Sequence, residues 1–360
     1  MSLSPDTTDL IARARADLRM GVPVVLTGAQ DVLVMAAETL SAPRLANLRA
    51  LGGTPWLAVT NWRAQTLKAR AYDGELARIA LPSDATLSWV QAVADPADDL
   101  NTPMKGPLVT ARDGDALGAR AAIHLMKDAR LLPASMVLDL KDGAAFARSH
   151  QLTAIPQATV LQTAASPLSP VISARLPLEV SEAGRLHIFR PDDGSEEHYA
   201  IEIGQPDRNA PALARLHSAC FTGDLLGSLK CDCGPQLRGA LAQMGAEGAG
   251  VLLYLNQEGR GIGLTNKMRA YSLQDQGFDT VEANHRLGFE DDERDFRIGA
   301  NILKKMGFSS VRLLTNNPKK VAMMEQSGIS VAQRVPLKVG ENRHNAAYLD
   351  TKAKKSGHIL

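Results

Sequence analysis

Hydrophobic and polar positions along the first 150 residues predict helices and short buried strands in alternation. The stretch TDLIARARADLRMG (8–21) predicts a helix, and the apolar run Val24–Leu26 after it predicts a buried strand. A second helix is expected over 43–51, because a proline occupies its first turn and two glycines follow its end. We therefore expect an α/β fold for this half of the chain.

In the second half of the chain, proline and glycine mark the starts and ends of the predicted helices more clearly. A helix that begins at Pro235 carries apolar residues on one face and is closed by glycines. The elements expected after it are a strand at 250–255, a helix at 264–276, a helix around 296–303, a strand at 311–315 and a helix from about 316 to 328. Strands separated by helices favour parallel pairing. We expect an α/β domain whose sheet is mostly parallel.

At 360 residues the chain is longer than one hydrophobic core usually supports, so we expect two domains. Residues 154–174 carry three prolines and no sustained hydrophobic period, and we place the linker there. The predicted organisation is a first domain over 1–153 and a second domain over 175–360.

Composition narrows the expected partners. Apolar residues make up 45% and charged residues 22% of the chain, which is ordinary for a globular protein. The formal net charge is +1, so an anionic ligand needs a local basic cluster, and neither a nucleic acid nor a membrane is an expected partner. No apolar run approaches the length of a membrane span, and we expect a cytoplasmic protein.

All three cysteines of the chain lie close together, with the spacing Cys220-x10-Cys231-x-Cys233. The one-residue gap would strain a disulfide, and three is an odd, low number for a disulfide scaffold. Three thiolates with one open position are typical of catalytic zinc, whereas His217 would complete a closed structural site. Three core cysteines without a metal are a further alternative. The spacing alone leaves these alternatives open.

Three other features have an ordinary structural explanation when taken alone. Asp292 lies in the largely acidic stretch 290–295, which is typical of a solvated surface. Tyr271 shares a predicted helix face with apolar residues, as a core residue would. The glycine-rich stretch QEGRGIG (257–263) has the spacing of neither a Walker A loop nor a dinucleotide fingerprint.

From about residue 171 onward the sequence resembles GTP cyclohydrolase II. The stretches that carry the resemblance are ARLHSACFTGDLLGSLKCDCGPQL, YLNQEGRGIGLTNKMRAYSLQDQGFDTVEAN, LGFEDDERDF, LLTNNPKK and YLDTKAKKSGHIL. They follow one another in order over most of the second half. The resemblance implies hydrolysis of GTP to 2,5-diamino-6-hydroxy-4-(5-phosphoribosylamino)pyrimidine, formate and pyrophosphate, the first step of riboflavin biosynthesis.

The same resemblance implies that Cys220, Cys231 and Cys233 hold a catalytic zinc ion, which activates water for attack on C8 of the guanine ring. C8 is a formamidine-like carbon, and its hydrolysis needs a nucleophile that is potent at neutral pH. Thiolate ligands suit zinc and persist in a reducing compartment. The resemblance also assigns His217 to the nucleotide and leaves the fourth zinc position to water.

Three further residues match catalytic positions of the family. Asp292 matches a proton acceptor, and Tyr271 matches a tyrosine that orients the base or the attacking water. Arg294 matches a proposed nucleophile on the α-phosphorus of GTP. A guanidinium has a pKa above about 12 and is ordinarily a bidentate phosphate clamp, so stabilising the transferring phosphoryl group is the easier role.

The resemblance also implies a set of GTP contacts, Mg²⁺ on the GTP phosphates and a homodimer. The matching residues are Arg215, Leu216, His217, Ser218, Ala219, Gln236, Glu258, Gly259, Arg260, Thr280, Thr315 and Lys320. Thr315 and Lys320 bracket a turn into a helix, which is a suitable place for phosphate. Ala219 departs from the family pattern, because it stands where the family commonly carries glutamate and offers no carboxylate to GTP or to the surroundings of the zinc.

The first half faintly resembles 3,4-dihydroxy-2-butanone-4-phosphate synthase, over LRMGVPVVLTGAQDVLVMAAETLSAPRLANLRALGG (18–53). That synthase needs an acidic magnesium-binding loop after its first strand, whereas this chain has TGAQD (27–31), with one acidic residue. We therefore expect a degenerate, inactive synthase-like domain that serves dimerisation, stability or regulation.

The sequence also allows two alternatives to complete hydrolysis of GTP. One is a variant cyclohydrolase that hydrolyses GTP only partly. The other is a nucleotide-binding regulator with a structural zinc, and the intact set of cysteines with Asp292, Arg294 and Lys320 argues against it.

Overall fold

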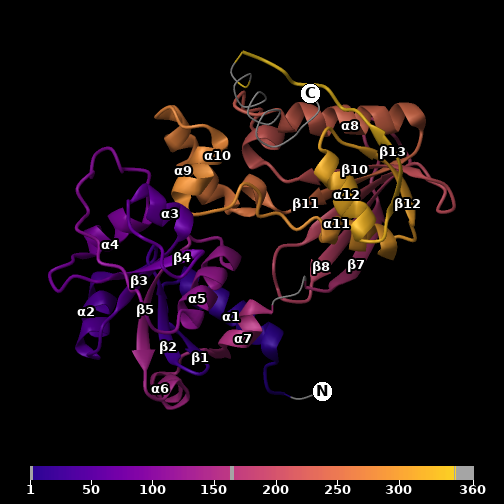
Figure 1. Cartoon of the computed structure of the whole chain (residues 1–360). Coiled ribbons are helices and arrows are strands. Elements are labelled where there is room, and N and C mark those ends of the chain that lie inside the picture. Colours follow the sequence, from indigo (N-terminus) through magenta and orange to yellow (C-terminus); the bar gives the residue numbers. More distant parts are fainter. Residues whose placement is uncertain (1–2, 163–165, 344, 346–360) are drawn as a thin grey trace. The chain divides into compact units, whose positions relative to one another are not determined.

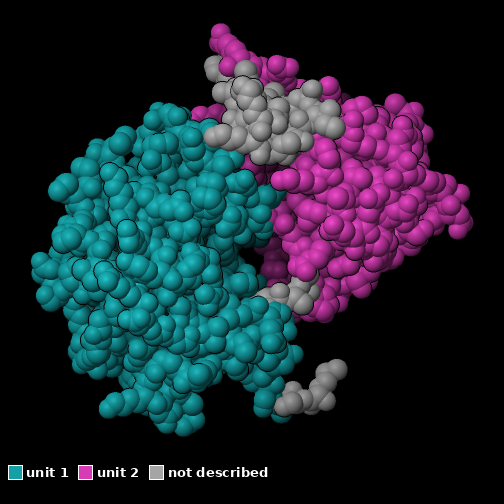
Figure 2. All heavy atoms as spheres, in the orientation of Figure 1, with its two compact units in different colours: residues 1–164, 265–293 teal, residues 165–264, 294–360 magenta. Residues whose placement is uncertain are grey.

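The computed structural model describes residues 3–162, 166–343 and 345. Its internal contacts divide the chain into two compact units, coloured separately in Figure 2. Unit 1 comprises Met1–Ala164 and Thr265–Glu293, and unit 2 comprises Ala165–Leu264 and Arg294–Leu360. The stretch 265–293 thus groups with the N-terminal residues, whereas the sequence placed it in the second domain.

Unit 1 is built on a six-stranded sheet with the strand order β4-β3-β5-β2-β1-β6 (Figure 1). The strands are β1 (Val24–Thr27), β2 (Asp31–Ala36), β3 (Trp56–Thr60), β4 (Leu76–Ala80), β5 (Ala134–Leu140) and β6 (Ala154–Pro156). Neighbours pair antiparallel except β1 and β6, which pair parallel.

Helices cover both faces of this sheet, because alternate strand residues point to opposite sides. Leu26 and Val34 pack in one cluster with residues of α1, α5 and α7, and Val25 and Leu33 pack in another with residues of α2, α3, α4 and α6. The helices are α1 (Thr7–Arg19), α2 (Ala42–Ala50), α3 (Asn61–Thr66), α4 (Leu87–Ala94), α5 (Leu117–Asp128), α6 (Gly143–His150) and α7 (Gln157–Leu161). Two further helices of unit 1, α9 (Gly263–Asp275, from Thr265 on) and α10 (Thr280–Leu287), come from the second half of the sequence.

Unit 2 is built on a seven-stranded sheet with the order β13-β12-β10-β11-β9-β8-β7. The strands are β7 (Leu168–Arg175), β8 (Gly184–Pro191), β9 (His198–Ile203), β10 (Ala212–Ser218), β11 (Gly250–Leu255), β12 (Ser310–Leu314) and β13 (Ser330–Val335). The pairs from β13 to β11 are parallel, and those from β11 to β7 are antiparallel.

The expectation of a mostly parallel sheet is therefore wrong, and the sheet is mixed. The strands found by pattern, β11 and β12, belong to the parallel half. The antiparallel meander β7–β8–β9 went unrecognised because it offers little hydrophobic period; β7 is buried only at Leu168. Part of β7 also falls in the stretch 154–174 that was predicted as a linker.

Helices cover the two faces of this second sheet as well. Ala240 and Met244 of α8 (Cys233–Glu247) pack on Leu213 and Leu252, whereas α11 (Arg297–Lys305) and α12 (Pro318–Gln326) pack on the opposite face. Two short turns complete the unit, the π-helical η1 (Phe221–Leu225) and the 3₁₀-helical η2 (Glu258–Gly261). None of the helices in the described residues has both the length and the apolar character needed to cross a membrane.

Candidate metal and anion site

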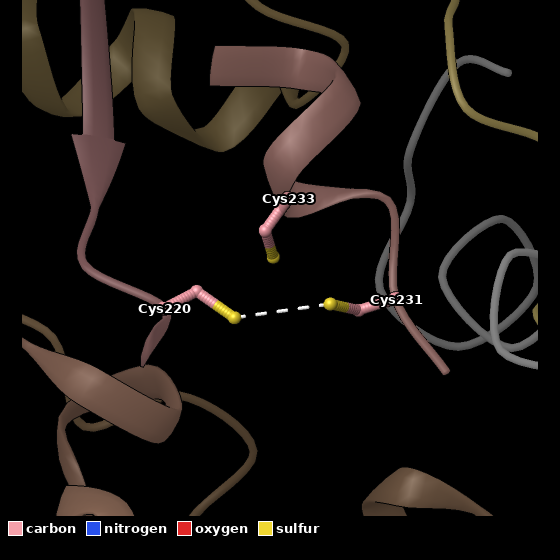
Figure 3. Close-up of side chains that lie close together, drawn as sticks. All are labelled: Cys220, Cys231 and Cys233. Carbon is pink, nitrogen blue, oxygen red and sulfur yellow. Dashed lines mark hydrogen bonds between the residues drawn. The ribbon is translucent and has the colours of Figure 1, made fainter. Parts of the chain in front are cut away.

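The three cysteines meet where strand β10 passes into α8. Cys220 follows β10 and caps η1, while Cys231 and Cys233 flank the start of α8. The three sulfur atoms lie within 4.8 Å of one another, and Sγ of Cys220 is 3.8 Å from Sγ of Cys231 (Figure 3). Cys220 and Cys231 are buried.

This arrangement fits a metal ion with sulfur ligands. Tetrahedral zinc with Zn–S bonds of about 2.3 Å places its sulfur ligands about 3.8 Å apart. Gly223 keeps the space between the thiols open, because a Cβ there would lie 2.8 Å from Sγ of Cys231 and 3.1 Å from Sγ of Cys220. The backbone of η1 therefore forms a cradle that only glycine allows.

Charge also favours a cation at this place. Hydrogen bonding to the Cys220 and Cys231 thiols, together with burial, raises the pKa of the Cys233 thiol well above its usual range. Thiolates so close together repel one another, and a divalent cation between them stabilises the deprotonated form. The cluster is thus chemically suited to zinc.

His217 does not belong to this group. Within the described part of the chain, the potential metal ligands that cluster here are the three cysteines alone. Nε2 of His217 lies 3.0 Å from both carboxylate oxygens of Asp224. Burial lowers the pKa of His217, so the neutral ring with its proton on Nε2 donates to the carboxylate. The closed Cys3His alternative is not supported by this geometry.

Asp224 joins the cysteine loop to the sheet. Besides His217, its Oδ2 accepts from the backbone N–H of Cys220 and from the hydroxyl of Tyr254, each at 3.0 Å. The Tyr254 ring also stacks on His217, with centroids 5.6 Å apart. Sequence reasoning gave Asp224 and Tyr254 no role; the one available signal for Tyr254 was a polar-tipped aromatic in the apolar run GVLLYL.

Three cations gather around the carboxyl end of β10. Nη1 of Arg215 donates to the carbonyl of Leu314 at 2.9 Å, and Nη2 donates to the side chain of Gln236. Nζ of Lys320 donates to the carbonyl of Leu216 at 3.1 Å, and Nη1 of Arg294 lies 3.3 Å from the hydroxyl of Ser218.

Two of these cations, Arg294 and Lys320, share one aromatic ring, and the charge of Arg294 also acts on Arg215. Burial lowers the pKa of Arg215 to about 10, with a further lowering from the charge of Arg294. The ring of Phe296 lies 4.7 Å from Cζ of Arg294 and 4.9 Å from Nζ of Lys320. Cations held so close together favour a polyanionic ligand, and the net charge of +1 requires such a cluster to be local.

Three further residues that the resemblance assigns to GTP, Thr315, Ala219 and Leu216, lie in β10 or directly after β10 and β12. Thr315 is buried and accepts from the N–H of Asn317 at the entrance to α12. The backbone N–H of Ala219 donates a hydrogen bond to the backbone carbonyl of Leu255 at 2.7 Å. Leu216 is buried in the core beside α11, so its carbonyl rather than its side chain takes part in the site.

The glycine-rich turn has an unusual backbone. Gly259 and Arg260 both adopt left-handed conformations, with φ of 63° and 60°. Such a conformation is strained for arginine, and strain of this kind clusters at ligand sites. Glu258 fixes the turn to the cysteine loop, because its Oε2 accepts from the backbone N–H of Phe221 at 2.6 Å.

The other three sequence-predicted residues, Tyr271, Thr280 and Asp292, belong to unit 1. Tyr271 lies on α9, with Nζ of Lys267 at 5.6 Å from its ring, and Thr280 begins α10 and accepts from Gln274 at 3.2 Å. Asp292 follows α10 in the acidic stretch and is exposed. The residues on either side of it form ion pairs, Asp291 with His285 at 2.8 Å and Glu293 with Lys127 at 2.6 Å.

Comparisons with known proteins bear on the whole chain. A family model described as GTP cyclohydrolase II matches residues 169–336. A GTP cyclohydrolase-2 from Azospirillum brasilense is 43% identical over 360 residues, which cover 97% of this chain and 94% of that protein. One from Actinobacillus succinogenes is 58% identical over 172 residues, 48% of this chain and 79% of that protein.

Among solved structures, a two-domain 3,4-dihydroxy-2-butanone 4-phosphate synthase from A. baumannii matches 91% of this chain and 99% of its own. The identity is 17% and the TM-score is 0.32, so this match does not define the fold of either unit.

Proposed function

This chain belongs to the GTP cyclohydrolase II family, and from that premise we propose that it hydrolyses GTP to 2,5-diamino-6-hydroxy-4-(5-phosphoribosylamino)pyrimidine, formate and pyrophosphate. This reaction is the first step of riboflavin biosynthesis. The observation that supports it best is the cradle of three thiols in the same unit as the cluster of Arg215, Arg294 and Lys320. The two features suit the two ends of GTP, a ring carbon to be hydrolysed and a triphosphate.

The metal of the proposed reaction is zinc held by Cys220, Cys231 and Cys233. When bound with an open position, zinc lowers the pKa of its water to about 7 and supplies a nucleophile for C8 at neutral pH. The chain's own contribution is to hold the ligands: Gly223 leaves room between the sulfur atoms, and Asp224 fixes the backbone of Cys220.

In this proposal Arg215, Arg294 and Lys320 bind the triphosphate, and Mg²⁺ binds to its phosphates. We assign Arg294 the role of a clamp that stabilises charge on the α-phosphate, because guanidinium is a poor nucleophile and an ideal bidentate partner for phosphoryl oxygen. Digestion of enzyme trapped with labelled GTP tests this. A modified Arg294 peptide would establish the covalent role, whereas no adduct together with substantial turnover by Arg294→Lys supports the clamp.

Asp292 is proposed as the proton acceptor, and Tyr271 as the residue that orients the guanine or the attacking water. The proposed GTP contacts also include the stretch from Leu216 to Ala219, with Gln236, Glu258–Arg260, Thr280 and Thr315. Ala219 contributes through its backbone, since its methyl group has no polar atom for GTP or for zinc-side hydrogen bonding.

For the N-terminal part we propose a synthase-like domain over 1–153 that has lost synthase activity, followed by a cyclohydrolase domain from 175 onward and a homodimeric, cytoplasmic assembly. The Actinobacillus relative is too short to contain a counterpart of the whole chain, which supports assigning the GTP chemistry to the second half. Formation of the four-carbon phosphate from ribulose 5-phosphate by the full-length protein would refute the loss of synthase activity.

One experiment tests the proposed reaction against its alternatives. Zinc-loaded protein is incubated with GTP and Mg²⁺, formate is quantified, and the nucleotide products are identified by mass spectrometry. Equimolar formate, pyrophosphate and diaminopyrimidine support complete hydrolysis. A formamido product or retained pyrophosphate identifies a variant cyclohydrolase, and GTP binding without products identifies a regulator.

A further inference from the structure

The stretch 265–293 carries three of the proposed active-site residues, yet it packs with the N-terminal part of the chain. It begins within α9 and continues through α10 to Glu293. Its contacts with the N-terminal residues lie inside unit 1, so they connect two parts of the sequence that the family resemblance treats separately.

Polar side chains join the two parts along the whole stretch. Arg269 of α9 donates from Nε to Asp95 at 2.7 Å and from Nη2 to Glu38 at 3.1 Å. The remaining contacts are Asn266 Nδ2 to the Arg130 carbonyl at 3.0 Å, Gln276 Nε2 to the Ala97 carbonyl at 3.0 Å, and Lys127 Nζ to Glu293 at 2.6 Å. These contacts span the stretch from its first turn to its last residue.

Close packing accompanies these bonds at α10. The rings of Trp62 and His285 stack with centroids 3.6 Å apart and an interplanar angle of 5°. Gly288 ends α10 with φ of 92°, and a Cβ there would lie 2.7 Å from the hydroxyl of Thr60 and 2.8 Å from Pro133. The end of α10 is therefore fitted against the start of α3.

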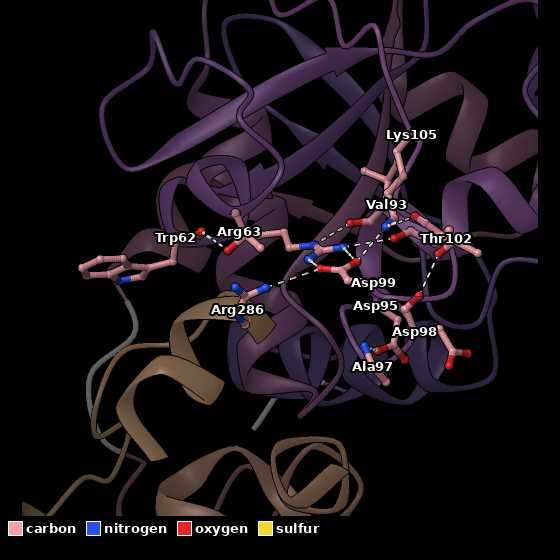
Figure 4. A network of polar contacts seen from close by, with 12 residues as sticks. Trp62, Arg63, Val93, Asp95, Ala97, Asp98, Asp99, Thr102, Lys105 and Arg286 are labelled. Atoms are coloured by element: carbon pink, nitrogen blue, oxygen red, sulfur yellow. Dashed lines mark hydrogen bonds and ion pairs between the residues drawn. The ribbon is translucent and has the colours of Figure 1, made fainter. Parts of the chain in front are cut away.

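A buried ion network lies beneath this contact (Figure 4). Arg63 is 1% exposed and pairs with both oxygens of Asp99, at 2.6 and 2.9 Å. Lys105 also pairs with Asp99, at 2.8 Å, and Nη1 of Arg286 on α10 lies 4.0 Å from the same carboxylate. Arg286 thus meets a carboxylate that the N-terminal fold already holds rigidly.

The contact of greatest functional interest is the one between Lys127 and Glu293. Lys127 lies on α5, and its ammonium holds the carboxylate of the residue next to Asp292. The same Oε1 of Glu293 accepts from the backbone N–H of Glu290 at 2.9 Å, which closes the acidic loop. A lysine of the N-terminal part therefore fixes the loop that carries the proposed proton acceptor.

We propose that the N-terminal part serves as a docking platform for the stretch 265–293, with Lys127 and Trp62 as positioning residues for GTP turnover. The proposal rests on the proposed function, because it needs Asp292, Tyr271 and Thr280 to act on GTP. It gives the inactive synthase-like domain a specific task. The domain acts through the conformation of one stretch and contributes no residue to the chemistry.

The test uses full-length, zinc-loaded variants. Lys127→Met removes the ammonium but keeps an unbranched side chain, Lys127→Arg retains the charge, and Trp62→Ala removes the stacked ring. Lys141→Met is the matched control, since Lys141 is an exposed lysine after β5. Formate release, zinc content and backbone hydrogen exchange of 265–293 are measured for each.

We expect Lys127→Met and Trp62→Ala to lower kcat about 10- to 100-fold, with KM within about threefold of the parent, because a small misplacement of a catalytic group has such effects. Exchange within 265–293 should rise, zinc content should stay unchanged, and Lys127→Arg should recover most of the activity. Parental kcat in both Lys127→Met and Trp62→Ala overturns the proposal. If the parent releases no formate, the proposed function fails instead. The docking is then judged by hydrogen exchange alone, which should still rise within 265–293 in Lys127→Met and Trp62→Ala.

Discussion

Three sulfur atoms can share one metal ion only if nothing lies between them, and Gly223 meets that requirement. The residue is buried in η1, with all three cysteines around the position that a side chain would take. The cysteine spacing in the sequence names the ligands, but it does not name this glycine. A single hydrogen atom in place of a methyl group keeps the site open.

We predict that Gly223→Ala lowers zinc affinity by at least about 100-fold, because the added methyl would overlap the sulfur atoms of Cys220 and Cys231. Competition with a chromophoric chelator measures the change. Gly239→Ala, inside α8, is the matched control, since its Cβ would meet nothing closer than 3.4 Å and alanine favours helix. Unchanged zinc affinity in Gly223→Ala would contradict the assigned cradle.

Asp224 offers a second test among single residues. It accepts hydrogen bonds from Cys220, His217 and Tyr254, so its loss frees the backbone that carries the first ligand. Asp224→Ala should weaken zinc binding about 10- to 100-fold, as removal of groups that orient metal ligands commonly does. Tyr254→Phe should have a smaller effect, because two of the three donors remain. Equal affinities in all three proteins would show that this network does not support the metal site.

Among the elements, local pattern predicted those that bury a regular face. The strands at 250–255 and 311–315 and the helices around 235–245, 264–276, 296–303 and 316–328 are confirmed as β11, β12, α8, α9, α11 and α12. The meander β7–β8–β9 was missed, since β7 is exposed along nearly its whole length and leaves no alternation to detect. The helix α10 was also not predicted, although Asp279 and Glu282 form a capping box at its start.

The buried network below α10 gives unit 1 a predictable response to acid. Burial raises the pKa of Asp99, but its bonds to Arg63 and Lys105 outweigh this effect, and the net pKa lies below the ordinary 3.8. A lowered carboxyl pKa contributes stability above the unfolded value that is lost as pH falls through the folded value. The parent should therefore lose stability steeply below about pH 4.

We predict that Asp99→Asn destabilises unit 1 by about 3 kcal/mol at pH 7, because it leaves the Arg63 guanidinium buried without its counter-charge. The difference in the free energy of unfolding between the variant and the parent should narrow as pH falls below about 4, because the parental carboxylate then becomes protonated as well. Urea unfolding followed by hydrogen exchange of β3 and β5 gives the measurement. A difference that stays constant over this range would contradict the assigned pKa shift.

At the scale of the whole molecule, the chain passes from unit 1 to unit 2, back at Thr265 and again at Arg294. All three cysteines lie in unit 2, and the described metal-ligand cluster involves no residue of unit 1. Zinc should therefore stabilise one unit directly, because a structural contribution from metal binding is confined to the fold that supplies its ligands.

Zinc removal tests this separation. Treatment with 1,10-phenanthroline under reducing conditions should abolish formate release and increase hydrogen exchange in η1 and the first turn of α8. Exchange in β1 and β2 of unit 1 should stay as in the zinc-loaded protein, and added zinc should restore both readouts. Equal loss of protection in the two units would show that they unfold as one.

Sequence was sufficient for those properties that depend on neighbouring residues and on side-chain chemistry. The ordered motifs from residue 171 onward identified the family by resemblance, which the comparison over 97% of the chain confirms. Tertiary structure was needed wherever residues distant in the chain meet. The mixed sheet, the gathering of Arg215, Arg294 and Lys320 and the docking of 265–293 all arise from such contacts. A local hydrophobic pattern does not predict these contacts, because it indicates which face of a helix or strand is buried but not which element packs against that face.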